Sequence, residues 1–183
     1  MSSIYTQRLE LVAVTLPMVE AALNDQPQEV CRLLGASLAS MWPGRELIER
    51  AFCASIDAIR ENPESRLWGD RIAVSRGPER KVIGSVIFHG KPIHGMVEVG
   101  YGVDLAFQGA GYATEATLGC SNWALAQPDV HLIRATTPPW HTASMRVLLK
   151  CGYSEVGLIE HESLGEVLAF ERSQDSVVPH STL

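Results

Sequence analysis

The chain has 183 residues, of which 46% are hydrophobic and 20% are charged. This length and composition are typical of one globular domain and exclude a largely disordered chain. The net charge of −6 disfavours binding to the polyphosphate backbone of a nucleic acid. Apolar runs are short, and no basic start precedes an apolar stretch, so we predict a cytoplasmic protein that does not bind membranes.

The cysteines and histidines give no sign of a metal site. The four cysteines are widely spaced and form no CxxC pair, so we predict reduced thiols rather than a zinc site or a disulfide framework. His89 and His94 flank a Gly/Pro turn without a nearby carboxylate pair, and we expect them at the surface. The sequence therefore predicts no bound metal.

The first part of the chain is predicted to form one strand followed by helices. Leu9–Thr15 is rich in apolar and β-branched residues and predicts a strand. Pro17 suits the first turn of a helix that runs to Leu23, and a short helix is expected at Gln28–Leu34. An apolar stripe at helical spacing predicts a longer helix over Arg45–Glu61, which the Asn62-Pro63 pair would end.

The hydrophobic period then changes to that of strands. Trp68–Val74, Val82–His89 and Val97–Leu105 are predicted strands, and no helix fits between them, so they should pair as an antiparallel meander. The remaining predicted elements are a helix at Gly111–Gln127, a strand at Val130–Thr137, a helix at Thr142–Cys151 that ends at Gly152, and strands at Tyr153–Ile159 and Val167–Glu171. The order predicts an α+β domain with one mixed, mostly antiparallel sheet of about seven strands flanked by about four helices.

The segment with a chemical signal is the glycine-rich turn between the third meander strand and the next helix. Gly109 and Gly111 lack a Cβ, so the backbone can approach a ligand closely and adopt a positive φ. The first amides of a helix have no partner within it and carry the positive end of its dipole. Together these features predict a site for a phosphate or pyrophosphate.

Two other phosphate motifs fit these residues poorly. A P-loop needs Gly-Lys-Ser/Thr at its end, which is absent here. A dinucleotide fingerprint would place a glycine-like residue at Thr114 and an acid at the end of the following strand, which instead ends at Ala135-Thr136-Thr137. That fold also needs parallel strands in place of the meander.

Gln108-Gly-Ala-Gly-Tyr-Ala113 resembles the Gln/Arg-x-x-Gly-x-Gly/Ala signature with which GNAT acetyltransferases bind the pyrophosphate of coenzyme A. Thr6-Gln-Arg-Leu-Glu-Leu11 is similar to the opening of the branch that contains the ribosomal-protein N-terminal acetyltransferases. Gly100-Tyr101, Tyr112-Ala-Thr-Glu-Ala116 and Ser144 to Tyr153 also resemble that branch. The resemblance covers residues 6–172 as one domain, and the polar remainder, 173–183, is expected to be a flexible tail.

The resemblance implies a GNAT-like fold in which two neighbouring strands splay and form a wedge for acetyl-CoA, the acetyl donor. In this family the backbone amides of the turn hold the pyrophosphate, and the preceding strand offers backbone groups to the pantetheine arm. The residues implied as coenzyme contacts are Val103, Leu105, Gln108, Gly109, Ala110, Gly111, Tyr112, Ala113 and, where the branch usually has Asn, His141.

Catalytic groups follow from the same resemblance. Ser144 would lie near the departing sulfur and is the candidate acid, although a serine near a helix start can instead cap the helix. The tyrosine that many members place four residues later is Leu148 here, so that role is unfilled. Glu98 is the preferred base, with Glu160 and Glu162 as alternatives.

The implied activity is transfer of an acetyl group to a primary amine by direct attack, without an enzyme nucleophile. The acceptor would be a peptide α-amine or a small-molecule amine, on an enzyme that is a monomer or homodimer. A terminal α-amine has a pKa of about 7.7 to 8.0, against about 10.4 for lysine, and so needs less help from a base. Trp42, Pro43 and the helix to Glu61 would shape the acceptor side. The missing tyrosine and His141 motivate a second hypothesis, a catalytically weak coenzyme A-binding sensor or partner module.

Overall fold

The computed structural model describes residues 2–38, 55–161 and 165–175. Trp42, Pro43, Cys53, Glu162 and the first part of the helix expected from Arg45 lie outside these ranges. The strands are β1 (Ile4–Tyr5), β2 (Leu9–Ala13), β3 (Ser37–Leu38), β4 (Arg71–Ser75), β5 (Lys81–Phe88), β6 (Met96–Val103), β7 (Leu132–Thr137), β8 (Ser154–His161) and β9 (Gly165–Ser173). The helices are α1 (Leu16–Leu23), α2 (Pro27–Leu34), α4 (Ile56–Glu61), α5 (Pro63–Arg66), α6 (Tyr112–Leu125) and α7 (Thr142–Lys150), with a 3₁₀ turn, η1, at Leu105–Phe107.

One sheet organises the described residues, with strand order β1-β2-β4-β5-β6-β7-β9-β8 and β3 beside β5. Neighbouring strands run antiparallel except in the pairs β3–β5 and β6–β7, which are parallel. The meander predicted from the sequence is confirmed, since β4, β5 and β6 pair antiparallel in chain order. The fold is therefore the mixed, mostly antiparallel α+β sheet expected from the pattern of elements.

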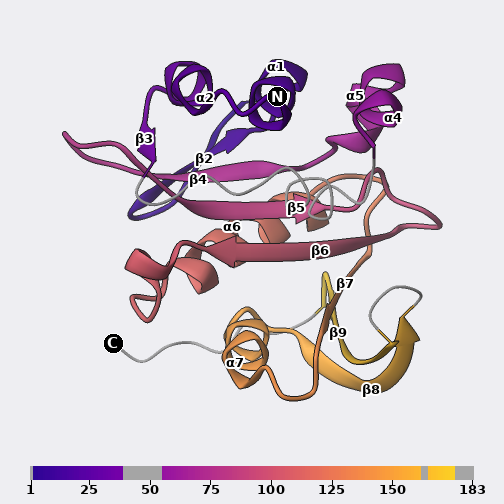
Figure 1. The fold of residues 1–183 in the computed structure, drawn as a ribbon. Coiled ribbons are helices and arrows are strands. Elements are labelled where there is room, and N and C mark those ends of the chain that lie inside the picture. The colour runs from indigo at the N-terminus through magenta and orange to yellow at the C-terminus, as the bar shows by residue number, and fades with distance from the viewer. Residues whose placement is uncertain (1, 39–54, 162–164, 176–183) are drawn as a thin grey trace.

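Helices cover both faces of the sheet (Figure 1). Helix α6 packs its buried Ala116, Cys120 and Ala124 into the main core together with residues of the central strands. On the other face, α1 and α2 bury Val19 and Val30 in two smaller clusters that contact β4. None of the helices in the described ranges is long and apolar enough to cross a membrane.

Two expected element boundaries before β5 are wrong. The helix expected through Ser55 does not include this residue, because Ser55 is extended (φ −69°, ψ 156°) and its hydroxyl accepts a hydrogen bond from the Ala58 amide as the N-cap of α4. The strand expected from Trp68 begins only at Arg71. Gly69, with φ +76°, turns the chain before it, and a Cβ there would lie 2.6 Å from Phe88.

The end of the chain stays against the domain as far as it is described. Strand β9 includes Ser173, and the Gln174 side chain donates to the Leu125 carbonyl oxygen at 2.8 Å. Residues 176–183, most of the expected tail, lie outside the described ranges.

Asp70, just before β4, is a fully buried carboxyl group. Its Oδ1 accepts a hydrogen bond of 2.7 Å from the Phe88 amide, while Oδ2 has no hydrogen-bond partner among the described residues. Burial raises the pKa of Asp70 to about 8, against the opposing effects of the Phe88 amide and the Arg71 charge. The side chain is therefore held as a neutral acid around pH 7.

The raised pKa of Asp70 makes stability depend on pH. The folded protein holds a proton that the unfolded chain releases above its ordinary pKa of 3.8, so the free energy of unfolding should fall as the pH rises from about 4 to about 8. Asp70→Asn should remove up to about 1.4 kcal/mol per pH unit of this slope in urea unfolding. Asp129→Asn, at an exposed position, is the control and should keep the wild-type slope. Equal slopes for wild type and Asp70→Asn would contradict a neutral buried Asp70.

Candidate functional site

Strands β6 and β7 run side by side only at their start. Their parallel register joins Met96 to Leu132, Val97 to Ile133 and Glu98 to Arg134, and pairing stops there. Among the described residues, strand β6 continues to Val103 with partners in β5 alone, while β7 continues to Thr137 paired with β9. The two strands therefore part after Glu98, which leaves one edge of β6 free to bind an extended chain.

The glycine-rich turn lies at the far end of that open edge. Strand β6 ends at Val103, and α6 begins at Tyr112 with Gly111 as its N-cap in the left-handed conformation (φ 80°, ψ 4°). Gly109 also has a positive φ of 75°, and a Cβ built there would meet no atom within 4 Å. The turn thus presents exposed backbone and the amides of a helix start, a fit for an anionic group.

The stretch before the turn differs from the expectation. Leu105 is not part of the strand, because the Asp104 carboxylate accepts a hydrogen bond from the Ala106 amide and starts the η1 turn. The Leu105 side chain is 84% exposed. Gln108 then folds back, and its Nε2 donates to the Val103 carbonyl oxygen at 3.0 Å. Gln108 therefore fixes the spacing between the strand end and the turn.

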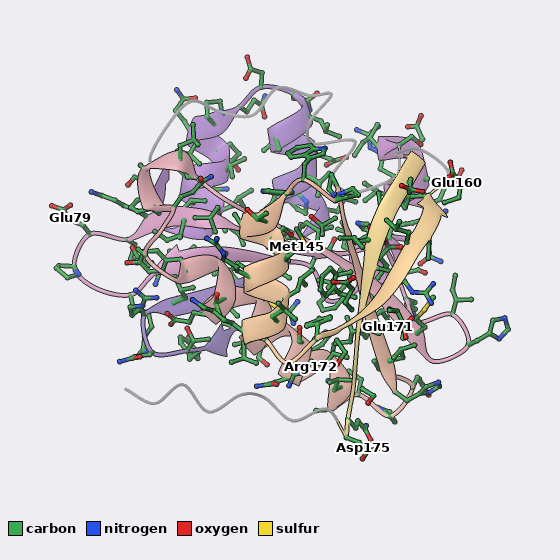
Figure 2. All side chains as sticks on the ribbon, turned by 90° about the horizontal axis from the view of Figure 1, so that it is seen from below. Glu79, Met145, Glu160, Glu171, Arg172 and Asp175 are labelled. Carbon is green, nitrogen blue, oxygen red and sulfur yellow. The ribbon has the colours of Figure 1, made fainter. Side chains whose placement is uncertain are left out.

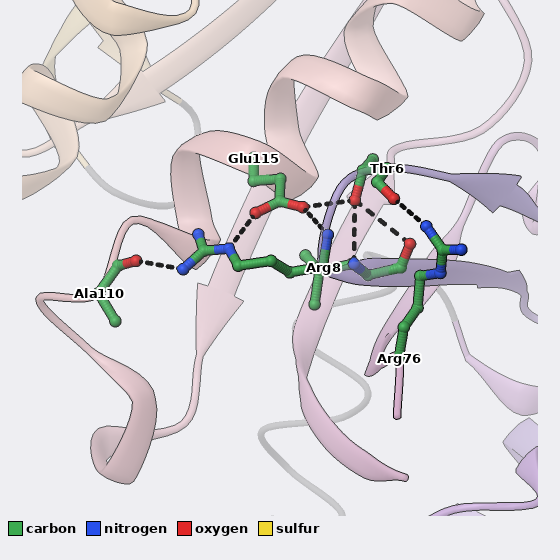
Figure 3. Close-up of polar contacts among 6 residues, drawn as sticks. Thr6, Arg8, Arg76, Ala110 and Glu115 are labelled. Atoms are coloured by element: carbon green, nitrogen blue, oxygen red, sulfur yellow. Dashed lines mark hydrogen bonds and ion pairs between the residues drawn. The ribbon is translucent and has the colours of Figure 1, made fainter. Parts of the chain in front are cut away.

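A polar network from the N-terminus holds the other side of the turn (Figure 3). The Glu115 carboxylate accepts hydrogen bonds from the Thr6 hydroxyl (2.6 Å), the Arg8 amide (2.7 Å) and Arg8 Nε (2.6 Å). Arg8 Nη1 donates to the Ala110 carbonyl oxygen at 2.9 Å, and its guanidinium stacks on the Tyr112 ring. Arg8 thus joins the start of β2 to the turn and to the first helical turn of α6.

This network lowers the pKa of Glu115. Burial alone would raise it, but the hydrogen bonds from Thr6 and Arg8 and the Arg8 charge bring it below its ordinary value of 4.5. Glu115 is therefore ionised at neutral pH. The contacts between Glu115 and Arg8 were not predicted from the sequence, where both residues were noted only within segments that resemble the family.

Ser144 lies within α7 and faces β6 across the open wedge. The N-cap of α7 is His141, so the interpretation of Ser144 as a helix cap is wrong. The Ser144 hydroxyl is 2.9 Å from the Tyr101 hydroxyl, which also lies 3.0 Å from the Ser144 carbonyl oxygen. Burial raises the pKa of Tyr101 to about 12, although the Ser144 hydrogen bond opposes this shift. Tyr101 is therefore protonated at neutral pH and places a phenol beside Ser144.

Glu98 lies where the two strands part. Its Oε1 accepts a hydrogen bond of 3.0 Å from Thr136 Oγ1, two residues beyond the last paired position of β7. Its Oε2 is 4.0 Å from Nδ1 of His89. The side chain of Glu98 is 26% exposed. The carboxylate is thus hydrogen-bonded to β7 and lies near His89 in the turn after β5.

The remaining candidates are spread more widely. His141 is exposed, and its ring lies 5.6 Å from that of Trp140. Glu160 is exposed near the tip of the β8–β9 hairpin, opposite Glu166 (Figure 2). Among the described residues, no three His, Cys, Asp or Glu side chains are grouped to hold a metal ion.

Breaking the contacts of Glu115 should loosen the turn. Glu115→Gln should lower the free energy of unfolding by about 1–3 kcal/mol at pH 7, because a charged acceptor of three hydrogen bonds is lost. Because its pKa is lowered in the folded protein, this stabilisation is present above 4.5 and should shrink as the pH falls below that value. Urea unfolding measures both effects. Glu155→Gln, on exposed β8, is the control, and an equal effect there would count against the network.

Comparison with known proteins identifies the family of the chain. A family model described as an acetyltransferase (GNAT) domain matches residues 8–154. The uncharacterized N-acetyltransferase YjdG of Bacillus subtilis (strain 168) is 26% identical over 159 residues, which covers 86% of this chain and 90% of that protein.

Two of the similar solved structures act on ribosomal proteins by their descriptions. RimL, a ribosomal L7/L12 alpha-N-protein acetyltransferase in complex with coenzyme A, has a TM-score of 0.64 at 17% identity, covering 96% of this chain and 100% of that one. A ribosomal-protein-S5-alanine acetyltransferase from Vibrio fischeri has a TM-score of 0.64 at 16% identity, covering 96% and 98%. Both solved structures share the fold of this chain, with its mixed, mostly antiparallel sheet. Because the family model spans most of the chain, the protein belongs to the GNAT family and is an N-acetyltransferase.

Proposed function

We propose that this N-acetyltransferase transfers an acetyl group from acetyl-CoA to a primary amine by direct attack. The observation that carries the proposal is the parting of β6 and β7 after Glu98, with the glycine-rich turn at the other end of the same strand. An extended ligand with a diphosphate at one end matches a free strand edge that leads to an anion-binding turn.

The chain's own backbone would bind the coenzyme. In this proposal the amides from Gly109 to Ala113 hold the pyrophosphate, and Gln108 keeps the turn at its distance from Val103. Val103 offers backbone groups to the pantetheine arm from the strand, whereas Leu105 offers them from the η1 turn. His141 stays a proposed contact at the start of α7.

Two proton transfers remain for side chains on opposite sides of the wedge. Ser144 is the proposed acid for the departing sulfur, and Tyr101 can replace the proton that Ser144 gives up, since their hydroxyls are 2.9 Å apart. On the acceptor side, Glu98 is the carboxylate proposed to promote removal of the proton from the amine. A backbone amide of the free β6 edge would stabilise the negative charge that develops on the carbonyl oxygen.

The acceptor proposed first is a terminal α-amine of a peptide, with a small-molecule amine as the other choice. Two similar structures are described as acetylating ribosomal proteins, one of them at the α-amine. A terminal α-amine is also more often uncharged at neutral pH than a lysine side chain. A cytoplasmic location belongs to the same proposal, and the described Cys31, Cys120 and Cys151 are free thiols as expected there.

A charge placed in the turn tests the binding site. Gly111→Glu should abolish the rise in melting temperature caused by saturating acetyl-CoA, because a carboxylate would occupy the place proposed for the pyrophosphate. The control is Gly165→Glu at the start of β9, which has a similar positive φ of 69° and no atom within 4 Å of a Cβ built there. Gly165→Glu should keep the full rise. A full rise in Gly111→Glu would mean that the turn does not bind the coenzyme.

Removal of the Ser144 and Tyr101 hydroxyls tests whether Ser144 is the acid that protonates the sulfur. Ser144→Ala should lower kcat by about 10²-fold with little change in KM for acetyl-CoA, and Tyr101→Phe should lower it by less. The double variant should be little worse than Ser144→Ala alone, since the phenol acts through the serine. Steady-state thiol release measures these effects, with Ser154→Ala on exposed β8 as control. A wild-type kcat in Ser144→Ala would exclude Ser144 as the acid.

A further inference from the structure

The described residues form an open cavity of about 450 Å³. It is formed by α4 and α5 on one side and by the turn after β5 on the other. The residues that line it include Ala58, Glu61, Ser65, Arg66, His89 and Lys91. His89 is the lining residue that also approaches Glu98, so the cavity and the fork of the two strands share one side chain.

The His89 ring lies over the side of β6 that carries Glu98 and Gly100. Nδ1 is 4.0 Å from Glu98 Oε2, and Nε2 is 3.6 Å from the position that a Cβ on Gly100 would take. Glu98 is itself oriented by the hydrogen bond from Thr136. At 4.0 Å the carboxylate acts on the ring through its charge and not through a hydrogen bond. A neutral imidazole with its proton on Nδ1 carries its lone pair on Nε2, beside Gly100.

The charges around His89 favour a neutral ring that can still accept a proton. Burial lowers the pKa of His89 below its ordinary value of 6.5, Glu98 on β6 raises it, and His161 at the end of β8 lowers it further. Glu61 on α4, Arg66 on α5 and Lys91 in the turn line the same cavity. Only 28% of the side chain is exposed.

We propose that His89 accepts the proton of the acceptor amine, with Glu98 as its positioning residue, and that the amine arrives through the cavity that His89 lines. This inference rests on the proposed function. The amine nitrogen forms a bond to the acetyl carbon, and the carbon–sulfur bond breaks with its electron pair going to sulfur. The amine proton goes to His89 Nε2 and later to water, while the sulfur receives a proton through Ser144.

The arrangement explains why Glu98 would act through another group. One of its oxygens is occupied by the Thr136 hydroxyl and the other faces Nδ1 of His89. A carboxylate in that position stabilises the imidazolium that forms when the ring takes a proton. Because the His89 ring lines the cavity, it can accept a proton there, whereas the Glu98 carboxylate lies where β6 and β7 part.

The pH profile of kcat/KM separates this proposal from a role of His89 in packing. In the wild type, both His89 and the amine must be deprotonated. The logarithm of kcat/KM, plotted against pH, should therefore rise with a slope of 2 below the pKa of His89. Between that pKa and the pKa of the amine, the slope should be 1. His89→Gln should have a slope of 1 throughout and be about 10²-fold slower at pH 7. Glu98→Gln should keep the steep part but move it to lower pH, because the carboxylate no longer raises the pKa of His89.

Two further variants complete the test. Ala58→Phe, which fills the cavity from α4, should raise KM for the amine and leave the affinity for acetyl-CoA unchanged. His94→Asn alters an exposed histidine near the same turn and should match the wild type. An unchanged profile in His89→Gln, or an unchanged amine KM in Ala58→Phe, would overturn the proposal. If the wild type bound acetyl-CoA but released no thiol with any amine, the proposed function would fall first, and this assignment with it.

Discussion

Strand β6 has a free edge because its two neighbours end their pairing at different places. It hydrogen-bonds to β5 as far as Val103, whereas β7 leaves it after Glu98 and stays with β9. The free backbone groups need a hydrogen-bonding partner, and an extended ligand can supply one along the whole edge. The same strand leads directly into the turn that opens α6. A single stretch of backbone thus joins the open edge of β6 to the glycine-rich turn.

The order of elements and the glycine-rich turn could be predicted because both are local. Hydrophobic period gave the meander and α6, and the residues from Gln108 to Ala113 gave the turn. The two-residue strands β1 and β3 are too short for any period to show. The break at Ser55 was hidden because the apolar stripe continues on both sides of it, and only the cap contact with Ala58 ends the pattern.

The side-chain pairs of the site were beyond prediction, because each joins segments that are distant in the chain. Tyr101 meets Ser144 across 43 positions, and Glu98 meets Thr136 across 38. Motifs contain both Tyr101 and Ser144, but they do not show that the two side chains meet. This is why the vacant tyrosine position at Leu148 suggested a missing role, while the structure places a different phenol beside the serine. Register and strand order determine these neighbours, and they are properties of the whole sheet.

The link between Arg8 and Glu115 spans 107 positions, so the glycine-rich turn is held by residues from opposite halves of the chain. Such a contact closes a long loop, and during synthesis it can form only after Glu115 has been made. The ligand proposed for this turn would therefore need both halves to be assembled, and once bound it would hold them together.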